Sequence, residues 1–215
     1  FCQTKNLYQI FFSKHEISKE TKKDGSPVTE ADMVSHRIIS HELNKLSLGI
    51  PILSEEDKQL SVEKARVFWL IDPLDGTKEF LNKKDEFTVN IALIRNSFPV
   101  LGVISAPALK RIYTGTKGGG SHRLENGISK EINTKKINKD LLRVALSRSH
   151  QSEKDKSFLK RASKNFKKIE VIEAGSSIKL CKVAEGSADI YCRLGPTSQW
   201  DIASGQAILQ FAGGL

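Results

Sequence analysis

Residues 69–81 are Trp69-Leu70-Ile71-Asp72-Pro73-Leu74-Asp75-Gly76-Thr77-Lys78-Glu79-Phe80-Leu81. Val67 to Ile71 is an apolar run rich in β-branched and aromatic residues, which predicts a buried strand. We expect this strand to stop at Asp72-Pro73, because proline has no N–H to donate and holds the residue before it extended. Asp75-Gly76 then turns the chain, and a short helix with exposed N–H groups is expected from Thr77 onward.

Two carboxylates, those of Asp72 and Asp75, are therefore expected at the end of a strand and beside a helix N-terminus. With the backbone carbonyl of Leu74 they form a set of hard oxygen ligands that suits Mg²⁺. An Asp-Pro followed by an Asp-Gly is also common in ordinary loops between a strand and a helix. The residue types alone leave a metal site and a plain turn as alternatives.

Two further motifs accompany this stretch, Leu53-Ser54-Glu55-Glu56 upstream and Trp200-Asp201 far downstream. In combination with Asp-Pro-Leu-Asp-Gly-Thr-Lys-Glu-Phe they resemble the lithium-sensitive, Mg²⁺-dependent phosphatases of the inositol monophosphatase superfamily. Within that superfamily the chain is most similar to the branch of 3′(2′),5′-bisphosphate nucleotidases. The resemblance runs from about Asp24 to the last residue. It implies a layered αβαβα sandwich, and it implies a final strand beyond Leu215.

The length and composition of the chain limit the classes of protein to which it can belong. A chain of 215 residues with 39% hydrophobic residues can bury a real core in one domain or two small ones. No run is long enough for a transmembrane helix and no signal peptide is visible. The three cysteines have no metal-binding spacing and leave one unpaired, which fits a reducing cytosol.

The net charge of +9 raises the alternative of a basic nucleic-acid-binding module. The lysines, however, are mixed with acidic and polar residues, and no stacking aromatics alternate with them, as a single-strand groove would require. We therefore interpret them as solvated surface whose field attracts a small anionic substrate, and expect no nucleic-acid partner.

Hydrophobic patterns predict the remaining elements. We expect helices over residues 1–20 and 32–46, a strand over 50–53, strands over 86–94, 100–104 and 111–114, and a flexible loop at 118–120. The polar stretch 125–140 is expected to separate two subdomains, 1–138 with most metal ligands and 139–215 with the substrate site. In the second half, strands (143–147, 169–172, 188–193) alternate with helices (153–164, 176–185, 201–211), which predicts an α/β architecture.

The resemblance assigns roles to individual residues. It implies two or three Mg²⁺ ions, one held by Glu55, Asp72 and the Leu74 carbonyl and another by Asp72, Asp75 and Asp201. It also implies that Asp32, in Thr29-Glu30-Ala31-Asp32, pairs with Thr77 to orient the attacking water, with Asp75 as a further catalytic residue. Read locally, Asp32 and Asp201 are equally good helix caps, and nothing local separates Glu55 from Glu56.

Basic and small residues of the second half suggest the substrate pocket. Gly175-Ser176-Ser177 is either an ordinary helix cap or, with Lys179 one turn later, an anion site; His150 and Arg193 could equally be surface residues. By resemblance, these residues hold a nucleotide and its second phosphate. The full expected substrate-contacting set is Glu55, Leu74, Asp75, Gly76, Thr77, His150, Ser176, Lys179, Arg193 and Asp201.

The resemblance implies hydrolysis of adenosine 3′,5′-bisphosphate to AMP and phosphate, inhibition by Li⁺, and a role in sulfur metabolism. An inositol monophosphatase or a fructose-1,6-bisphosphatase is the near alternative. We expect a cytoplasmic monomer or homodimer, and peripheral association with the inner membrane stays open.

Overall fold

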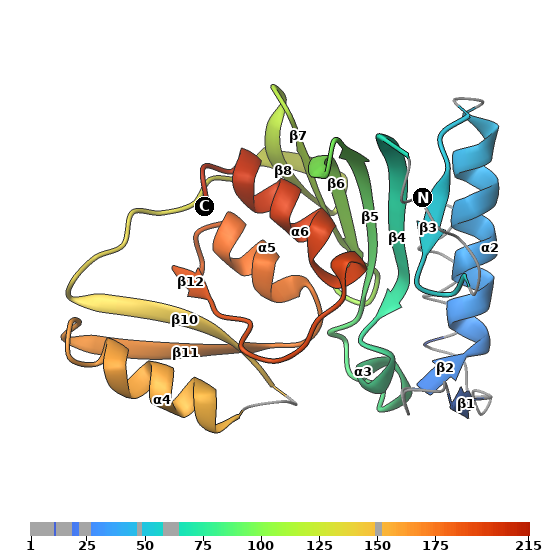
Figure 1. Ribbon diagram of the computed structural model, residues 1–215. Coiled ribbons are helices and arrows are strands. Elements are labelled where there is room, and N and C mark those ends of the chain that lie inside the picture. Colours follow the sequence, from blue (N-terminus) through green and yellow to red (C-terminus); the bar gives the residue numbers. More distant parts are fainter. Residues whose placement is uncertain (1–10, 12–18, 22–26, 47–48, 58–64, 149–151) are drawn as a thin grey trace.

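Five layers of helix and sheet stack side by side in the computed structural model (Figure 1). The structure describes residues 11, 19–21, 27–46, 49–57, 65–148 and 152–215. In these residues the layers are helix α2 (Glu30–Lys45), a seven-stranded sheet, helices α5 (Ile178–Ala184) and α6 (Gln199–Phe211), a three-stranded sheet, and helix α4 (Glu153–Ala162). The predicted αβαβα sandwich is confirmed.

The seven-stranded sheet forms the second layer and carries the central motif. Its order is β3 (Ile52–Ser54), β4 (Val67–Asp75), β5 (Thr88–Arg95), β6 (Phe98–Ala106), β7 (Arg111–Thr116), β8 (Gly120–Glu125) and β9 (Ile128–Glu131). Strand β3 is parallel to β4, and every other neighbouring pair is antiparallel. The short helix α3 (Thr77–Leu81) follows β4 directly, so the Asp-Gly-Thr turn lies at the end of this strand.

Strand β4 does not stop at Asp72-Pro73, and that expectation was wrong. The strand continues to Asp75, and its register with β5 shifts between the pairs Asp72↔Asn90 and Asp75↔Thr88. Pro73 lies within this irregular segment, where a strand tolerates a residue that cannot donate a ladder hydrogen bond. The bulge brings both aspartates to the same strand end.

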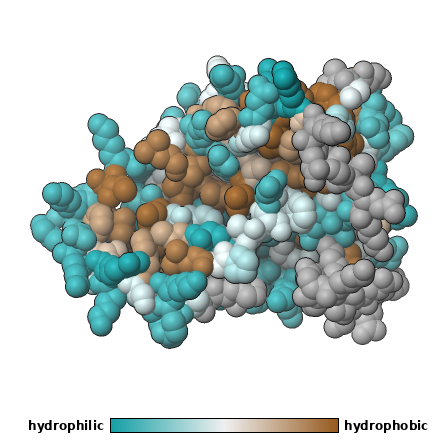
Figure 2. Space-filling model, viewed as in Figure 1, coloured by the Kyte–Doolittle hydropathy of each residue, from teal (hydrophilic) through white to brown (hydrophobic). Residues whose placement is uncertain are grey.

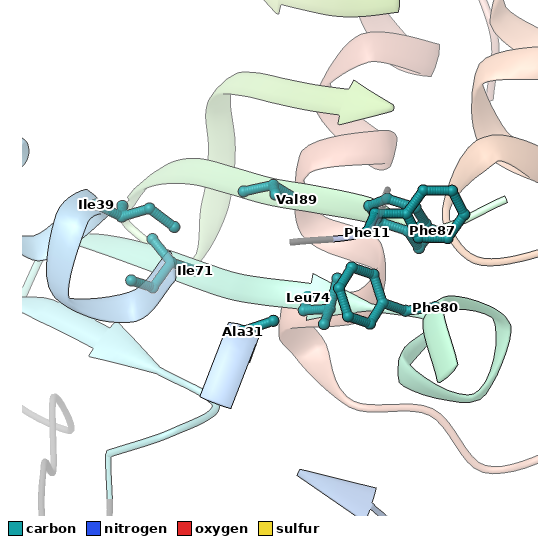
Figure 3. Close-up of a cluster of buried hydrophobic side chains, with 8 residues drawn as sticks. All are labelled: Phe11, Ala31, Ile39, Ile71, Leu74, Phe80, Phe87 and Val89. Carbon is teal, nitrogen blue, oxygen red and sulfur yellow. The ribbon is translucent and has the colours of Figure 1, made fainter. Parts of the chain in front are cut away.

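Apolar side chains from four elements hold this strand end in place (Figure 3). Ile39 of α2 packs with Ile71 of β4, and Phe80 of α3 meets Phe87 edge-on with ring centroids 5.0 Å apart. Both phenylalanines are fully buried. Burying a large aromatic side chain contributes roughly 2–3 kcal/mol, so this cluster fixes the turn that carries the predicted metal ligands.

Two strands were missed because they are polar. Strand β8 lies mostly between the loop expected at 118–120 and the polar boundary expected at 125–140, and strand β9 lies within that boundary. Strand β9 is the edge of the sheet, and all four of its residues are exposed, so an alternating apolar pattern is not required there. Gly118 and Gly120 adopt positive φ values of 84° and 70° in a tight turn between β7 and β8. The expectation of a flexible loop at 118–120 was therefore wrong.

The three-stranded sheet has β10 (Leu141–Ser147) between β11 (Lys168–Ala174) and β12 (Ile190–Tyr191), all parallel. The predicted alternation of strands and helices in this half is confirmed, although β12 is shorter than expected and α5 begins only at Ile178. Helix α4 covers the outer face, and Figure 2 shows hydrophilic side chains over it. A division of the chain at residue 138 stays a prediction.

Most of the expected N-terminal helix, residues 1–10 and 12–18, lies outside the described residues. Its expected end is wrong, because Lys19–Thr21 forms strand β1, which pairs with β2 (Pro27–Thr29). None of the helices in the described part of the chain is long and apolar enough to cross a membrane.

Candidate active site

A cavity of about 220 Å³ lies where the two halves of the chain meet. The first half contributes four predicted residues and the second half contributes four more: Glu55, Asp75, Gly76, Thr77, Ser176, Lys179, Arg193 and Asp201. Further lining residues include Lys78, Glu79, Ser177 and Tyr191. One pocket thus has an acidic and a basic side, and Glu56 is not among its lining residues.

Asp72 is not one of the cavity-lining residues: it is 1% exposed, near the carboxylates of the acidic side, and its Oδ1 accepts a 3.0 Å hydrogen bond from the backbone N–H of Leu74. Burial raises its pKa well above the usual range, and the charges of Asp75, Glu55 and Asp201 raise it further. A hydrogen bond between the carboxyl groups of Glu55 and Asp72 acts in the same direction, because it requires a proton. The four carboxylates therefore act on one another, although they come from three separate segments of the chain.

Asp75 is held from two directions. Its Oδ2 accepts a 2.7 Å hydrogen bond from the backbone N–H of Ser177, and Thr88 and Asn90 approach the same oxygen at 3.4 and 3.5 Å. Burial and the charge of Asp201 raise the pKa of Asp75 to about 6, although the ammonium of Lys179 lowers it. Fixed hydrogen-bond donors thus orient the Asp75 carboxylate, while burial and the charge of Asp201 make its ionised form less favourable.

Thr88, Asn90 and Ser177 were not predicted as site residues. They are 0%, 1% and 3% exposed, and the Ser177 Oγ donates to Asn90 Oδ1 at 2.7 Å and lies 2.8 Å from Thr88 Oγ1. A signal was present in the sequence: Thr88 and Asn90 alternate with apolar residues in a strand that is otherwise core. Polar side chains two residues apart share one face, and here that face meets the acidic pair of β4.

Asp32 and Thr77 meet as the resemblance implied. The Thr77 hydroxyl lies 3.3 Å from Asp32 Oδ1 and 3.2 Å from the Leu74 carbonyl oxygen. Asp32 also caps α2, because its Oδ2 accepts from the backbone N–H and the hydroxyl of Thr29 at 2.7 and 2.6 Å. The cap interpretation of Asp32 is confirmed, while its role in orienting water stays a prediction, since the other carboxylate oxygen is the one that faces Thr77.

Asp201 likewise has two roles. It closes a capping box at the start of α6, accepting from the Ser198 backbone N–H at 2.9 Å and from the Thr197 hydroxyl at 2.8 Å. The same residue lines the cavity and affects the pKa of Asp72 and Asp75. The helix cap thus fixes a carboxylate from the second half of the chain at the acidic side.

The basic side is formed by Lys179 and Arg193. Lys179 is 4% exposed and donates to the carbonyl oxygens of Ala174 and Ser176. Burial lowers its pKa, while the charge of Asp75 raises it. Arg193 is exposed and donates to the Pro196 carbonyl oxygen at 2.7 Å, and His150 lies outside the described residues.

Carboxylate and carbonyl oxygens, the donors preferred by hard divalent cations, converge on the acidic side. Among the described residues, no three His, Cys, Asp or Glu side chains already stand at metal-binding separations. The carboxylates of Asp72, Asp75, Asp201 and Glu55 repel one another, which raises the pKa of Asp72 and of Asp75, and a bound divalent cation would relieve this repulsion. The residues present therefore fit such a cation in chemistry.

The chain is similar to known proteins over nearly its whole length. The 3′(2′),5′-bisphosphate nucleotidase CysQ of Salmonella typhimurium is 41% identical over 209 residues, which is 96% of this chain and 82% of that protein. Its namesake from Escherichia coli K12 is 39% identical, with the same coverage of 96% and 82%. The crystal structure of CysQ from Bacteroides thetaiotaomicron matches with a TM-score of 0.86 at 35% identity, covering 98% of this chain and 82% of that one. The sequence model of the inositol monophosphatase family matches residues 5–215, and this chain belongs to that family.

Proposed function

We propose that this protein is a Mg²⁺-dependent 3′(2′),5′-bisphosphate nucleotidase that removes the 3′-phosphate of adenosine 3′,5′-bisphosphate, giving AMP and phosphate. The observation that carries this proposal is the pairing of an acidic and a basic side in one cavity of about 220 Å³. The acidic side suits a cation and the phosphate to be cleaved, and the basic side suits a second anionic group. The similarity to CysQ nucleotidases supports the same substrate class.

The proposed ligands of a first ion are Glu55, Asp72 and the Leu74 carbonyl, and those of a second are Asp72, Asp75 and Asp201. The number of bound ions, two or three, stays a prediction. Bound Mg²⁺ would supply a Lewis acid that neutralises charge on the phosphate and lowers the pKa of water. The protein's part would be to present these oxygens together, and the bulge of β4 and the cap of α6, which orient Asp72, Asp75 and Asp201, support this role.

The chain's own groups orient the reactants. Thr77 and Asp32, whose side chains meet at 3.3 Å, would hold the attacking water in line with phosphorus. The new bond forms between water oxygen and phosphorus while the bond from phosphorus to the 3′-oxygen breaks. The backbone N–H groups of Gly76 and Thr77 would donate to the phosphate oxygens, because both residues line the cavity at the start of α3.

Ser176, Lys179, Arg193 and His150 would hold the nucleotide and its second phosphate. Lys179 suits this role because its ammonium is buried beside the cavity, where a charge is poorly screened. An inositol monophosphatase or fructose-1,6-bisphosphatase would place sugar hydroxyls or a sugar phosphate there. A cytoplasmic location and a monomeric or homodimeric state stay predictions.

Phosphate release tests the proposal. Initial rates are measured on adenosine 3′,5′-bisphosphate, inositol 1-phosphate and fructose 1,6-bisphosphate, with Mg²⁺ and with a chelator. We expect the nucleotide to be preferred, Mg²⁺ to be required and Li⁺ to inhibit. Asp75→Asn should lower the rate by at least about a hundredfold, because it removes a ligand charge and not only a supporting contact.

Asp85→Asn is the matched control, because Asp85 is an exposed carboxylate in the loop after α3. An unchanged rate is expected for it. A preference for inositol 1-phosphate would reject the substrate assignment, and equal rates for Asp75→Asn and wild type would reject the metal assignment. Salt-dependent binding of oligonucleotides without any phosphate release would instead favour a nucleic-acid-binding module.

A further inference from the structure

Glu86 lies between the two loops that form the pocket. A Cβ placed on Gly76 would stand 3.2 Å from the Glu86 carbonyl oxygen, and one placed on Gly175 would stand only 2.7 Å from the same oxygen. The backbone of each glycine therefore packs directly on Glu86. Gly76 belongs to the Asp-Gly-Thr turn of the first half, and Gly175 belongs to the loop between β11 and α5 in the second half.

The side chain of Glu86, in the first half of the chain, also forms hydrogen bonds to residues of the second half. Its Oε2 accepts from the Gly175 backbone N–H at 3.0 Å and from Arg148 Nε at 2.9 Å, and its Oε1 accepts from an Arg148 terminal nitrogen at 3.0 Å. Arg148 follows β10 and donates to the carbonyl oxygen of Glu173 at 3.1 Å. The Glu86 side chain is 22% exposed, and such bidentate, charge-assisted contacts are stronger and more directional than neutral hydrogen bonds.

Ser176 lies between two residues that are held by hydrogen bonds to the first half of the chain: Gly175, bound by Glu86, precedes it, and Ser177 follows it. On its far side, Ser177 is held by Asp75 and Asn90. Ser176 itself has a φ of 43°, in the left-handed region that a residue with a side chain rarely adopts, and its carbonyl oxygen accepts from the Lys179 ammonium. Its Oγ is buried and has no hydrogen-bond partner among the described residues. A backbone conformation of this kind persists only where the surrounding contacts impose it.

We propose that Glu86 is a positioning residue that fixes loop 174–177 against the Asp-Gly-Thr turn and thereby sets where Ser176 and Lys179 face the substrate. Glu86 does not line the cavity, so it acts through the Gly175 amide and Arg148. This inference rests on the proposed function for the identity of the substrate. It predicts that Glu86 affects the recognition of the part of the substrate that lies on the basic side, and not the cleavage chemistry itself.

The experiment compares two substrates in wild type, Glu86→Ala and Glu86→Gln. One is adenosine 3′,5′-bisphosphate, and the other is p-nitrophenyl phosphate, which has a single phosphate and no second anionic group for the basic side. Glu86→Ala should raise KM for the nucleotide roughly tenfold or more, the effect of losing one charge-assisted contact. Its kcat/KM on p-nitrophenyl phosphate should stay within about twofold of wild type, because Ser177 still holds Asp75.

Glu86→Gln serves as the conservative variant, because its amide oxygen can still accept from Gly175. It should recover much of the lost nucleotide affinity. Glu125→Gln is the matched control: Glu125 forms a similar pair with Arg111 at 2.7 Å, on β7 and β8, and its side chain is similarly exposed at 29%. Its kinetic constants should equal those of wild type. Thermal unfolding of each variant reports whether it is folded. If Glu86→Ala is not folded, the kinetic constants of Glu86→Gln decide whether Glu86 positions the loop.

Three results would overturn the role of Glu86: an unchanged KM for the nucleotide, an equal loss on both substrates, or a glutamine variant as damaged as the alanine variant. The wild type's own preference among substrates tests the proposed function separately. If wild type prefers another phosphate ester, the same ratios measured on that ester still decide the role of Glu86.

Discussion

The backbone N–H of Ser177 donates a 2.7 Å hydrogen bond to Oδ2 of Asp75, across 102 positions of sequence. This bond joins a loop of the second half to the end of strand β4 in the first half. A carboxylate proposed to bind a cation is thereby oriented by a fixed backbone donor. Neither half of the chain holds this arrangement alone, which explains why the cavity lies at their junction.

Asn90 should be essential for this arrangement. Asn90→Ala removes the acceptor of the Ser177 hydroxyl and a donor near Asp75, and leaves buried polar groups unsatisfied. We expect a stability loss of about 1–3 kcal/mol, measured by urea unfolding. We also expect a fall in kcat of roughly tenfold or more. Asn82→Ala removes an exposed hydrogen bond to the Lys78 carbonyl and should change neither quantity appreciably; equal effects of the two substitutions would contradict the prediction.

The Thr77 hydroxyl should matter for turnover more than for stability. Thr77→Val keeps the shape of the side chain but removes the group that contacts Asp32 and the Leu74 carbonyl. We expect kcat to fall roughly a hundredfold, in the range for a lost catalytic positioning or proton-transfer group, with little change in KM. Thr77→Ser retains the hydroxyl and should retain most of the activity. Steady-state kinetics on the nucleotide make the comparison, and an active valine variant would remove Thr77 from the mechanism.

Stability of the metal-free protein should depend on pH through the acidic cluster. Burial and Asp201 raise the pKa of Asp75 to about 6, above its value in an unfolded chain. A carboxyl group with a raised pKa favours folding while protonated, so its contribution is present below about pH 4 and is lost as pH rises through about 6. Mg²⁺ needs the deprotonated form, so it should raise Tm more at about pH 7.5 than at about pH 5.

Thermal unfolding with Mg²⁺ and with a chelator measures this difference. Asp75→Asn should reduce both the loss of metal-free stability between the two pH values and the stabilisation by Mg²⁺. A Tm increase that is the same at both pH values would show that the cluster is not the site of binding.

Asp189 should contribute to stability and not to catalysis. Its side chain is 2% exposed and accepts from the backbone N–H, Nε and a terminal nitrogen of Arg143 at 2.7, 3.1 and 2.6 Å. Burial raises its pKa, but these hydrogen bonds outweigh burial and hold the pKa below the usual range. Asp189→Asn should therefore cost about 2 kcal/mol at neutral pH. The wild-type advantage should be present above about pH 4 and disappear as pH falls through the lowered pKa.

Asp140→Asn is the control for this substitution. Asp140 pairs with Lys167 at 2.6 Å, but both side chains are largely exposed, at 62% and 81%. Such a surface pair contributes about 0–1 kcal/mol. Urea unfolding of the two variants at several pH values compares them, and an equal cost for both would refute the role given to burial.

The amino-acid sequence by itself determined the central strand, turn and helix, and the alternation of strands and helices in the second half. These are local signals, because proline, glycine, capping residues and apolar periodicity act within a few positions of the chain. The sequence did not show that β4 runs through Pro73, since a bulge depends on the partner strand. It also did not show β8 and β9, because both strands are largely polar and β9, at the edge of the sheet, is exposed along its whole length.

The tertiary structure alone decided how the site is held together. No sequence pattern showed which groups Thr88, Asn90, Ser177 and Glu86 contact, because these contacts join residues 62 to 102 positions apart. Polar side chains form such hydrogen bonds when packing removes them from water, because the other buried polar groups are then their available partners. Which carboxylate is oriented, and by which donor, was therefore settled when the two halves of the chain came into contact.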